Sequence, residues 1–181
     1  MKAINFINSI LLFIDTVNHK VGRFTSFFIV GMLVPILFEV VQRYILNRPT
    51  LWAHELSTFF FGASWVMGAG YTFLLGGHVN MDVFYSKYTR RKKAVLDIIT
   101  YACTFTFCFF MFTETVEMAA ESWAIKEISE TLWAPPLYPI KTLLPIGVLL
   151  LLLQSLNKFI RDMGLAITGR EVFSPPKYNK I

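Results

Sequence analysis

The sequence predicts an all-α membrane protein that forms a single domain over residues 1–181. Hydrophobic residues make up 55% of the chain and the mean hydropathy is +0.52, above the apolar usage of about 45–50% in soluble domains. Each of four long apolar stretches approaches the roughly 20 residues that a helix needs to cross the hydrocarbon core. Because lipid offers the backbone no hydrogen bonds, such stretches are expected to be helical. The predicted transmembrane spans are 24–44, 56–75, 94–113 and 138–160.

The first 20 residues predict an amphipathic helix that lies on the membrane surface ahead of the first span. Apolar residues recur at helical spacing, whereas Asp15 and Asn18 fall elsewhere around the helix. Polar residues interrupt the segment and no small-residue cleavage site follows, so a cleaved signal peptide is not expected. We expect 1–20 to be an amphipathic arm and 161–181 to be a cytoplasmic tail. The recurring apolar positions are Ile4, Ile7, Leu11 and Ile14.

Lysine and arginine are distributed unevenly between the two ends of the predicted spans. Of the 17 basic residues, 13 fall in the N-terminal arm, the turn between the second and third spans, and the tail, and four fall in the other two turns. The positive-inside rule therefore predicts that both termini are cytoplasmic. The acidic residues after the third span then lie on the outer side. The same rule explains the net charge of +5 without a nucleic-acid partner.

The predicted spans contain few of the ionisable side chains that mark transport pathways inside membranes. Glu39 and Arg43 lie one helical turn apart near the outer end of the first span, where they can pair. Asp97 lies one turn inside the third span and Lys141 begins the fourth. The centres of the second, third and fourth spans hold no charge. This distribution favours a subunit of a larger transporter over a self-sufficient carrier.

Small residues repeat every four positions along the second span and so lie on one helix face. In lipid, such a face lets helix backbones approach closely. Two interpretations remain open: packing among the four spans, or a contact face for a partner subunit. The residues are Ser64, Gly68, Thr72 and Gly76.

The histidines and cysteines do not predict a metal or haem site. His54 and His78 stand at opposite ends of the second span, roughly 36 Å apart at about 1.5 Å per residue. His19 belongs to the predicted cytoplasmic side. Cys103 and Cys108 lie on one helix inside the third span, where free, packed thiols are expected. With no phosphate loop, nucleophile elbow or metalloprotease motif in the sequence, we expect no catalytic, substrate-binding or metal-binding residue and no cofactor.

The turns at the span ends carry more specific signals. Thr50 can cap the second span, Glu55 lies near the positive end of that helix, and Trp52 suits the membrane interface. Gly76 begins a pair of glycines that can end the span with a left-handed residue. Pro139 lies near the first turn of the fourth span, as proline often does.

Taken in order, these turns resemble those of a known family, the small membrane subunit of the tripartite ATP-independent periplasmic (TRAP) transporters of bacteria and archaea. The likeness extends over nearly the whole chain, from the amphipathic start through the four spans. The residues that support it are Arg48-Pro49, Trp52 and Glu55, then Gly77-His78-Val79 with Asp82, then Leu137-Tyr138-Pro139 with Lys141 and Pro145-Ile146-Gly147.

The resemblance implies a role in organic-acid uptake across the bacterial inner membrane. In that family a periplasmic binding protein delivers the acid to a large membrane subunit, which couples uptake to sodium by an elevator movement. The small subunit surrounds the static scaffold of the large one and holds neither substrate nor sodium. The expected partners are therefore the large subunit, the binding protein and membrane lipids. The candidate partner-interface residues are Glu39, Arg43, Arg48, Trp52, Glu55, Ser64, Gly68, Thr72, His78, Asp82 and Lys141.

Two alternatives from other functional classes stay open at the level of sequence. One is a membrane redox or assembly protein whose active region is His78 and the cytosolic turn. The other is a small exporter that dimerises and uses Glu39 as its coupling carboxylate.

Overall fold

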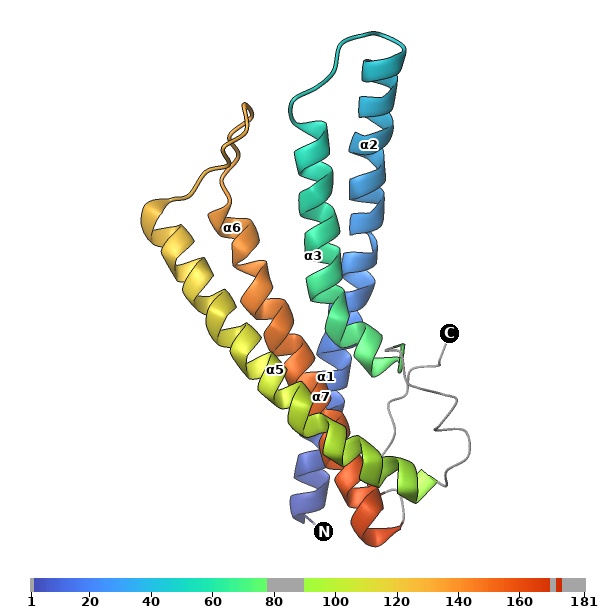
Figure 1. Ribbon diagram of the computed structural model, residues 1–181. Helices are drawn as coiled ribbons and strands as arrows, with labels where there is room; N and C mark the ends of the chain where they lie inside the picture. The colour runs from blue at the N-terminus through green and yellow to red at the C-terminus, as the bar shows by residue number, and fades with distance from the viewer. Residues whose placement is uncertain (1, 78–89, 170–171, 174–181) are drawn as a thin grey trace.

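The computed structural model describes residues 2–77, 90–169 and 172–173, and within these ranges the chain is helical without a β-strand (Figure 1). A single isolated bridge between Ile128 and Pro136 closes the loop before the last helices. The all-α prediction is thus confirmed for the described residues. The helices are α1 (Lys2–Ser26), α2 (Phe28–Tyr44), α3 (Ala53–Leu74), α5 (Arg90–Ile125), α6 (Tyr138–Lys141) and α7 (Leu143–Thr168).

Two stretches of the described residues are long and apolar enough to cross a membrane, Ile4–Tyr44 and Tyr138–Thr168. They contain the first and fourth predicted spans. The second predicted span falls on α3 up to Leu74, and the third lies wholly within α5. The apolar stretches are therefore helical as expected, while the number of spans stays a prediction.

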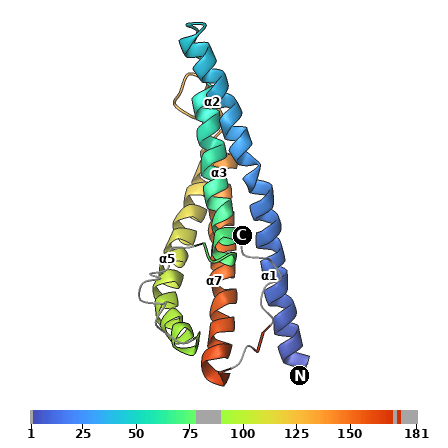
Figure 2. The same cartoon turned by 90° about the vertical axis from the view of Figure 1, so that its right-hand side faces the viewer.

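α1 and α2 form one long rod that is interrupted only at Phe27 (Figure 2). At about 1.5 Å per residue the rod is roughly 65 Å long, about twice the ~30 Å thickness of the hydrocarbon core. α1 therefore continues the line of the first span, and the predicted boundary between a surface arm and a span near residue 24 is absent.

α3 occupies the centre of the bundle, where it packs against α1 and α2 on one side and against α7 on another. α5 packs along α7, so α7 separates it from the α1–α2 rod (Figure 2). Figure 1 shows the α2–α3 hairpin and the α5–α7 hairpin diverging away from the N-terminal end of the molecule. The helices consequently share one packed region near α1 and separate toward the opposite end of the molecule.

α1 has the predicted amphipathic character, but its polar face points inward. Asp15 and Asn18 are each only 1% exposed, whereas Phe6 and Phe13 are 68% and 69% exposed. From Leu11 onward this segment packs against α3 and α7, so the predicted surface arm is part of the bundle, and its position relative to the membrane surface stays a prediction. Asn18 lies level with Gly70 of α3 and Leu150 of α7, both inside predicted spans.

Glycines permit the closest contacts between helices. A Cβ atom at Gly70 would stand 2.1 Å from Asn18 Oδ1, and one at Gly147 would stand 2.7 Å from the carbonyl oxygen of Val66. The predicted face of small residues lies elsewhere on α3: a Cβ at Gly68 would meet only Thr25 Oγ1, at 4.0 Å. The close contacts of α3 with α1 and α7 therefore do not use that face.

The helix ends follow local sequence signals at two of three predicted places. Gly76 has a φ of +71° just after α3, which confirms the left-handed glycine. Pro139 lies in the first turn of α6, also as predicted. The expected cap by Thr50 is wrong, since α3 begins at Ala53 after Trp52 without a side-chain cap.

Candidate functional site: two polar clusters on opposite parts of the bundle

Polar side chains of α1 and α7 form a buried, hydrogen-bonded group that we call the α1–α7 polar cluster. Gln154 Nε2 donates to Asp15 Oδ1 at 2.8 Å, and Asn18 Nδ2 donates to Gln154 Oε1 at 2.9 Å. Asn157 Nδ2 donates both to Asp15 Oδ1 at 2.9 Å and to the carbonyl oxygen of Leu11 at 2.8 Å. The members of the cluster are Asp15, Asn18, Gln154, Asn157 and Arg161.

Arg161 neutralises the only carboxylate of the cluster. Its Nη2 donates to Asp15 Oδ2 at 2.6 Å and its Nε donates to Asn157 Oδ1 at 2.8 Å. The side chains of Arg161 and Asp15 are 14% and 2% exposed. A buried ion pair persists when extra hydrogen bonds satisfy both partners, and here amides surround the pair on both sides.

A third helix joins α7 beside this cluster. Tyr101 Oη on α5 donates to Asp162 Oδ2 at 2.8 Å, and the Tyr101 ring contacts Phe159 edge-on at 5.5 Å between centroids. Tyr101 itself is buried. Polar bonds thus tie both α1 and α5 to the same segment of α7.

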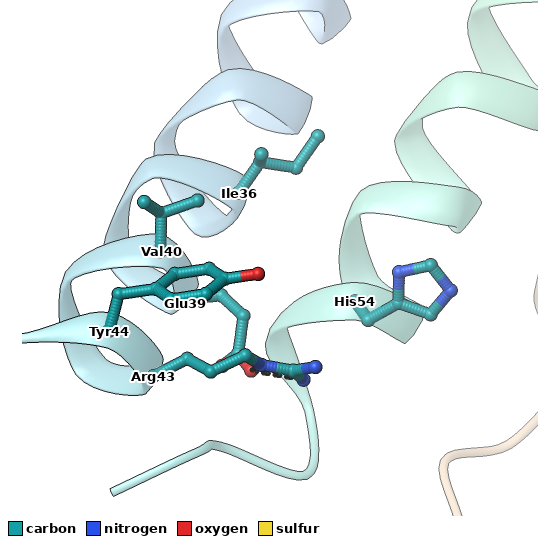
Figure 3. Close-up of a pocket in the computed structure, with 6 residues that line it drawn as sticks. All are labelled: Ile36, Glu39, Val40, Arg43, Tyr44 and His54. Carbon is teal, nitrogen blue, oxygen red and sulfur yellow. Dashed lines mark hydrogen bonds and ion pairs between the residues drawn. The ribbon is translucent and has the colours of Figure 1, made fainter. Parts of the chain in front are cut away.

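The C-terminal end of α2 and the loop after it carry the second group, the Glu39 cluster, made of Glu39, Arg43 and Thr50. Arg43 donates Nε and Nη2 to Glu39 Oε1 at 2.9 and 2.6 Å, which confirms the predicted pair (Figure 3). The Thr50 amide donates to Glu39 Oε2 at 3.0 Å, and the Thr50 hydroxyl donates to the same oxygen. This bond explains why Thr50 does not cap α3: its hydroxyl holds the α2–α3 loop on α2.

Two further polar contacts fix the connection between α5 and α7. Lys141 Nζ donates to Glu127 Oε1 at 2.7 Å, and Thr131 Oγ1 donates to Glu55 Oε2 at 2.6 Å. The Thr131–Glu55 bond connects the loop between α5 and α6 to the first turn of α3. The hydrogen bonds from the Lys141 ammonium hold the pKa of Glu127 below its ordinary value.

The structure brings only some of the predicted interface residues together. Glu39 and Arg43 share one cluster, whereas Glu55 and Lys141 make separate bonds to the α5–α7 connection. Trp52 stacks on Phe38 with ring centroids 5.6 Å apart. The other candidates lie apart from these contacts: Arg48 and Thr72 are exposed, Ser64 and Gly68 are half-buried, and His78 and Asp82 lie outside the described residues.

No metal-binding group is present in the part of the chain that the structure describes. No three histidine, cysteine or carboxylate side chains come together there in an arrangement that could hold a metal ion. Cys103 and Cys108 are free thiols, the first exposed and the second buried.

Sequence analysis missed the α1–α7 polar cluster, although a signal for it exists. Gln154, Asn157 and Arg161 recur at helical spacing within or just after a long leucine-rich stretch, and Asp15 and Asn18 do so on α1. Two apolar helices that each carry a polar stripe can satisfy those stripes against each other in lipid. Because the sequence prediction places Asp15 and Asn18 on a surface helix and Arg161 in the tail, it does not pair the two polar stripes.

Comparison with known protein families matches most of the chain to one family model. The family model described as tripartite ATP-independent periplasmic transporters, DctQ component, matches residues 32–165. The match covers most of the chain, from α2 into α7, and includes the Glu39 cluster and all three α7 members of the polar cluster. No curated protein matches the chain.

Proposed function

The chain belongs to the DctQ family, the small membrane component of TRAP transporters, and on this premise we propose that it is a non-catalytic scaffold subunit of a sodium-coupled organic-acid uptake system. In this proposal the chain enlarges and anchors the large membrane subunit. Substrate and sodium bind to that subunit, and a periplasmic binding protein supplies the substrate. The family is one of transporter components and not of enzymes.

The observation that best supports a scaffold role is that the carboxylates of Asp15 and Glu39 are both hydrogen-bonded to side chains of the same chain. Asp15 accepts hydrogen bonds from Arg161, Gln154 and Asn157, and Glu39 accepts hydrogen bonds from Arg43 and Thr50. A carboxylate that couples ion movement must exchange its partner during transport. Asp15 and Glu39 are instead held by cations and amides of the same chain, which suits a rigid subunit.

Reconstitution into liposomes tests the scaffold role. The chain alone should take up no organic acid, whereas the chain with its large subunit, binding protein and an inward sodium gradient should. Uptake driven by sodium with this chain alone would contradict the proposal. Equal uptake by the large subunit and binding protein without this chain would show that the scaffold is dispensable.

We propose that the partner interface includes the open face of α3. Ser64, Gly68 and Thr72 lie along it, and they leave room for another helix to approach closely. Gly68→Leu should leave the isolated chain as stable as the unmodified one but reduce co-purification with the large subunit. Gly62→Leu is a matched control, because a Cβ there meets nothing within 4 Å, a Cβ at Gly68 meets only Thr25 Oγ1 at 4.0 Å, and Gly62 lies off this face.

The proposed topology has four spans with both termini in the cytoplasm of a bacterial cell. A cysteine replacing Lys92 should react only with membrane-permeant thiol reagents in intact cells, and one replacing Glu127 should also react with impermeant reagents. The native Cys103 and Cys108 must first be replaced by serine or alanine. Labelling of the Lys92 position by an impermeant reagent would reverse the topology.

The exporter hypothesis gains no support from the geometry of Glu39. Both of its oxygens are occupied, one by Arg43 and the other by Thr50. The redox or assembly hypothesis depends on His78, which lies outside the described residues. A visible absorption band in the purified chain would support that hypothesis.

A further inference from the structure

A small cavity opens between the outer ends of α2 and α3 beside the Glu39 cluster (Figure 3). Its volume is about 220 Å³. Apolar side chains of α2 form one part of its wall, and polar side chains form the rest. The lining residues are Ile36, Glu39, Val40, Arg43, Tyr44 and His54.

Hydrogen-bond donors in this cavity are held ready for a ligand. Glu39 occupies Nε and Nη2 of Arg43, and no bond among the described residues engages Nη1. The Tyr44 hydroxyl and the His54 imidazole have no partner among those residues either. Figure 3 shows the Arg43 guanidinium and the Tyr44 hydroxyl both extended from α2 toward α3. An arginine held by a carboxylate through Nε and Nη2 still carries its charge and can donate hydrogen bonds from Nη1, which suits binding of an oxyanion.

The surroundings of the cavity are those of a membrane interface. Leu37 and Val41 of α2 are exposed apolar side chains next to the cavity, and the stacked Trp52 and Phe38 lie at the same end of the helix pair. Tryptophan and tyrosine favour the headgroup level. A ligand in the cavity can therefore place an anionic group on Arg43 while its apolar part follows the exposed face of α2.

From this arrangement we infer that the cavity binds the phosphate group of a phospholipid in the outer leaflet. The phosphate accepts hydrogen bonds from Arg43 Nη1 and the Tyr44 hydroxyl, and an acyl chain lies along Ile36 and Val40. The His54 imidazole points away from α2 in Figure 3, so it borders the cavity without facing these two donors. Glu39 acts as the positioning residue, because it keeps the Arg43 side chain from extending into water. The placement of the cavity at headgroup depth and the choice of leaflet both rest on the proposed topology.

Native mass spectrometry of the full chain in detergent with added dioleoylphosphatidylglycerol tests this site. We expect one lipid to remain bound per chain. Tyr44→Phe should weaken its binding roughly tenfold, since a lost hydrogen bond to a charged group is worth about that factor. This variant leaves the Glu39 cluster intact, so its folding is not at risk. Arg43→Gln should weaken binding further.

Arg48→Gln is the matched control, because it removes an exposed arginine of the same outer surface that does not line the cavity. It should bind lipid like the unmodified chain. Dioleoylglycerol, which lacks the phosphate, should give no retained adduct, and inorganic phosphate should not displace the lipid. Equal lipid binding by all variants would mean annular lipid only and would overturn the inference. Displacement of the lipid by inorganic phosphate would indicate a site for free anions. Loss of the lipid when the chain binds the large subunit would mean that this subunit occupies the cavity. Either result would also overturn the inference of a phospholipid site.

Discussion

The α1–α7 polar cluster and the Glu39 cluster both centre on a carboxylate paired with arginine, yet they join very different parts of the chain. Asp15 and Arg161 come from the first and last long helices, and both side chains are largely buried. Glu39 and Arg43 are one turn apart on α2, and the Arg43 side chain is 53% exposed. The same chemical pair is thus a tertiary contact in one region and a local contact in the other.

This difference determines what each pair can contribute. The cost of leaving a charge unpaired rises with its burial, so Asp15 depends on Arg161 more than Glu39 depends on Arg43. Glu39 also keeps two hydrogen bonds from Thr50 when Arg43 is removed. We therefore expect the α1–α7 polar cluster to hold the bundle together and the Glu39 cluster to shape a local surface.

The largest expected effect is from Arg161→Leu, which leaves the Asp15 carboxylate buried without a counter-charge. Breaking such a pair typically costs about 3–5 kcal/mol of stability. The thermal unfolding midpoint of the purified chain in detergent should fall strongly. The double variant Asp15→Leu with Arg161→Leu should recover much of that loss, since neither charge remains. Equal midpoints for the single and double variants would mean that water reaches Asp15.

Gly70→Ala tests the contact that brings α1 into the bundle next to this cluster. The new Cβ would stand 2.1 Å from Asn18 Oδ1 and 3.2 Å from the backbone of Leu150, so the Asn18 side chain must move and α7 must give way slightly. Overpacking of this kind costs roughly 1–3 kcal/mol. Gly68→Ala on the same helix should change the unfolding midpoint little. Similar midpoints for both variants would show that α1 is not packed against α3 at Asn18.

Arg43→Ala should have a smaller effect than Arg161→Leu, on the order of 1 kcal/mol, because its pair is partly solvated. The double variant with Glu39→Ala should be more stable than Arg43→Ala alone, as no unpaired carboxylate is left near lipid. The same midpoint measurement would compare all three chains. If Arg43→Ala proved as damaging as Arg161→Leu, the contrast between the two clusters would fail.

The smallest expected effect is the change of protein stability with pH that the Glu127–Lys141 ion pair produces. The pKa of Glu127 is lowered by folding, so its contribution to stability is fully present above the ordinary value of 4.5 and is lost as pH falls through the folded pKa. Glu127→Gln should therefore lower the unfolding midpoint at pH 7, and this difference should disappear in acid. A constant difference at every pH would exclude the ion pair as its cause.

Local features of this fold follow directly from the sequence. Glu39 and Arg43 pair because four residues make about one helical turn, and Gly76 ends α3 because a left-handed residue is needed there. The helical apolar stretches follow from length and hydropathy. Each of these depends on neighbours within a few positions of the chain.

The α1–α7 polar cluster could not be obtained in the same way. Asp15 and Arg161 are 146 positions apart, and no local rule selects one as the partner of the other. The same limit holds for the face of small residues on α3, which contains Ser64, Gly68 and Thr72. The spacing of these residues predicts that a helix can approach closely, but not which helix does so. The close contacts of α3 with α1 and α7 instead use Gly70 and other positions.

The helical period of α1 was set by its sequence, and the direction of its polar face was decided by the tertiary structure. An amphipathic pattern states that two faces differ in polarity, but not which of them meets the solvent. In water the polar face is the outer one. Lipid solvates apolar side chains, so the phenylalanines of α1 can stay outside while Asp15 accepts hydrogen bonds from Asn157 and Arg161 and Asn18 Nδ2 donates to Gln154. Only the position of α7 beside α1 supplies those partners.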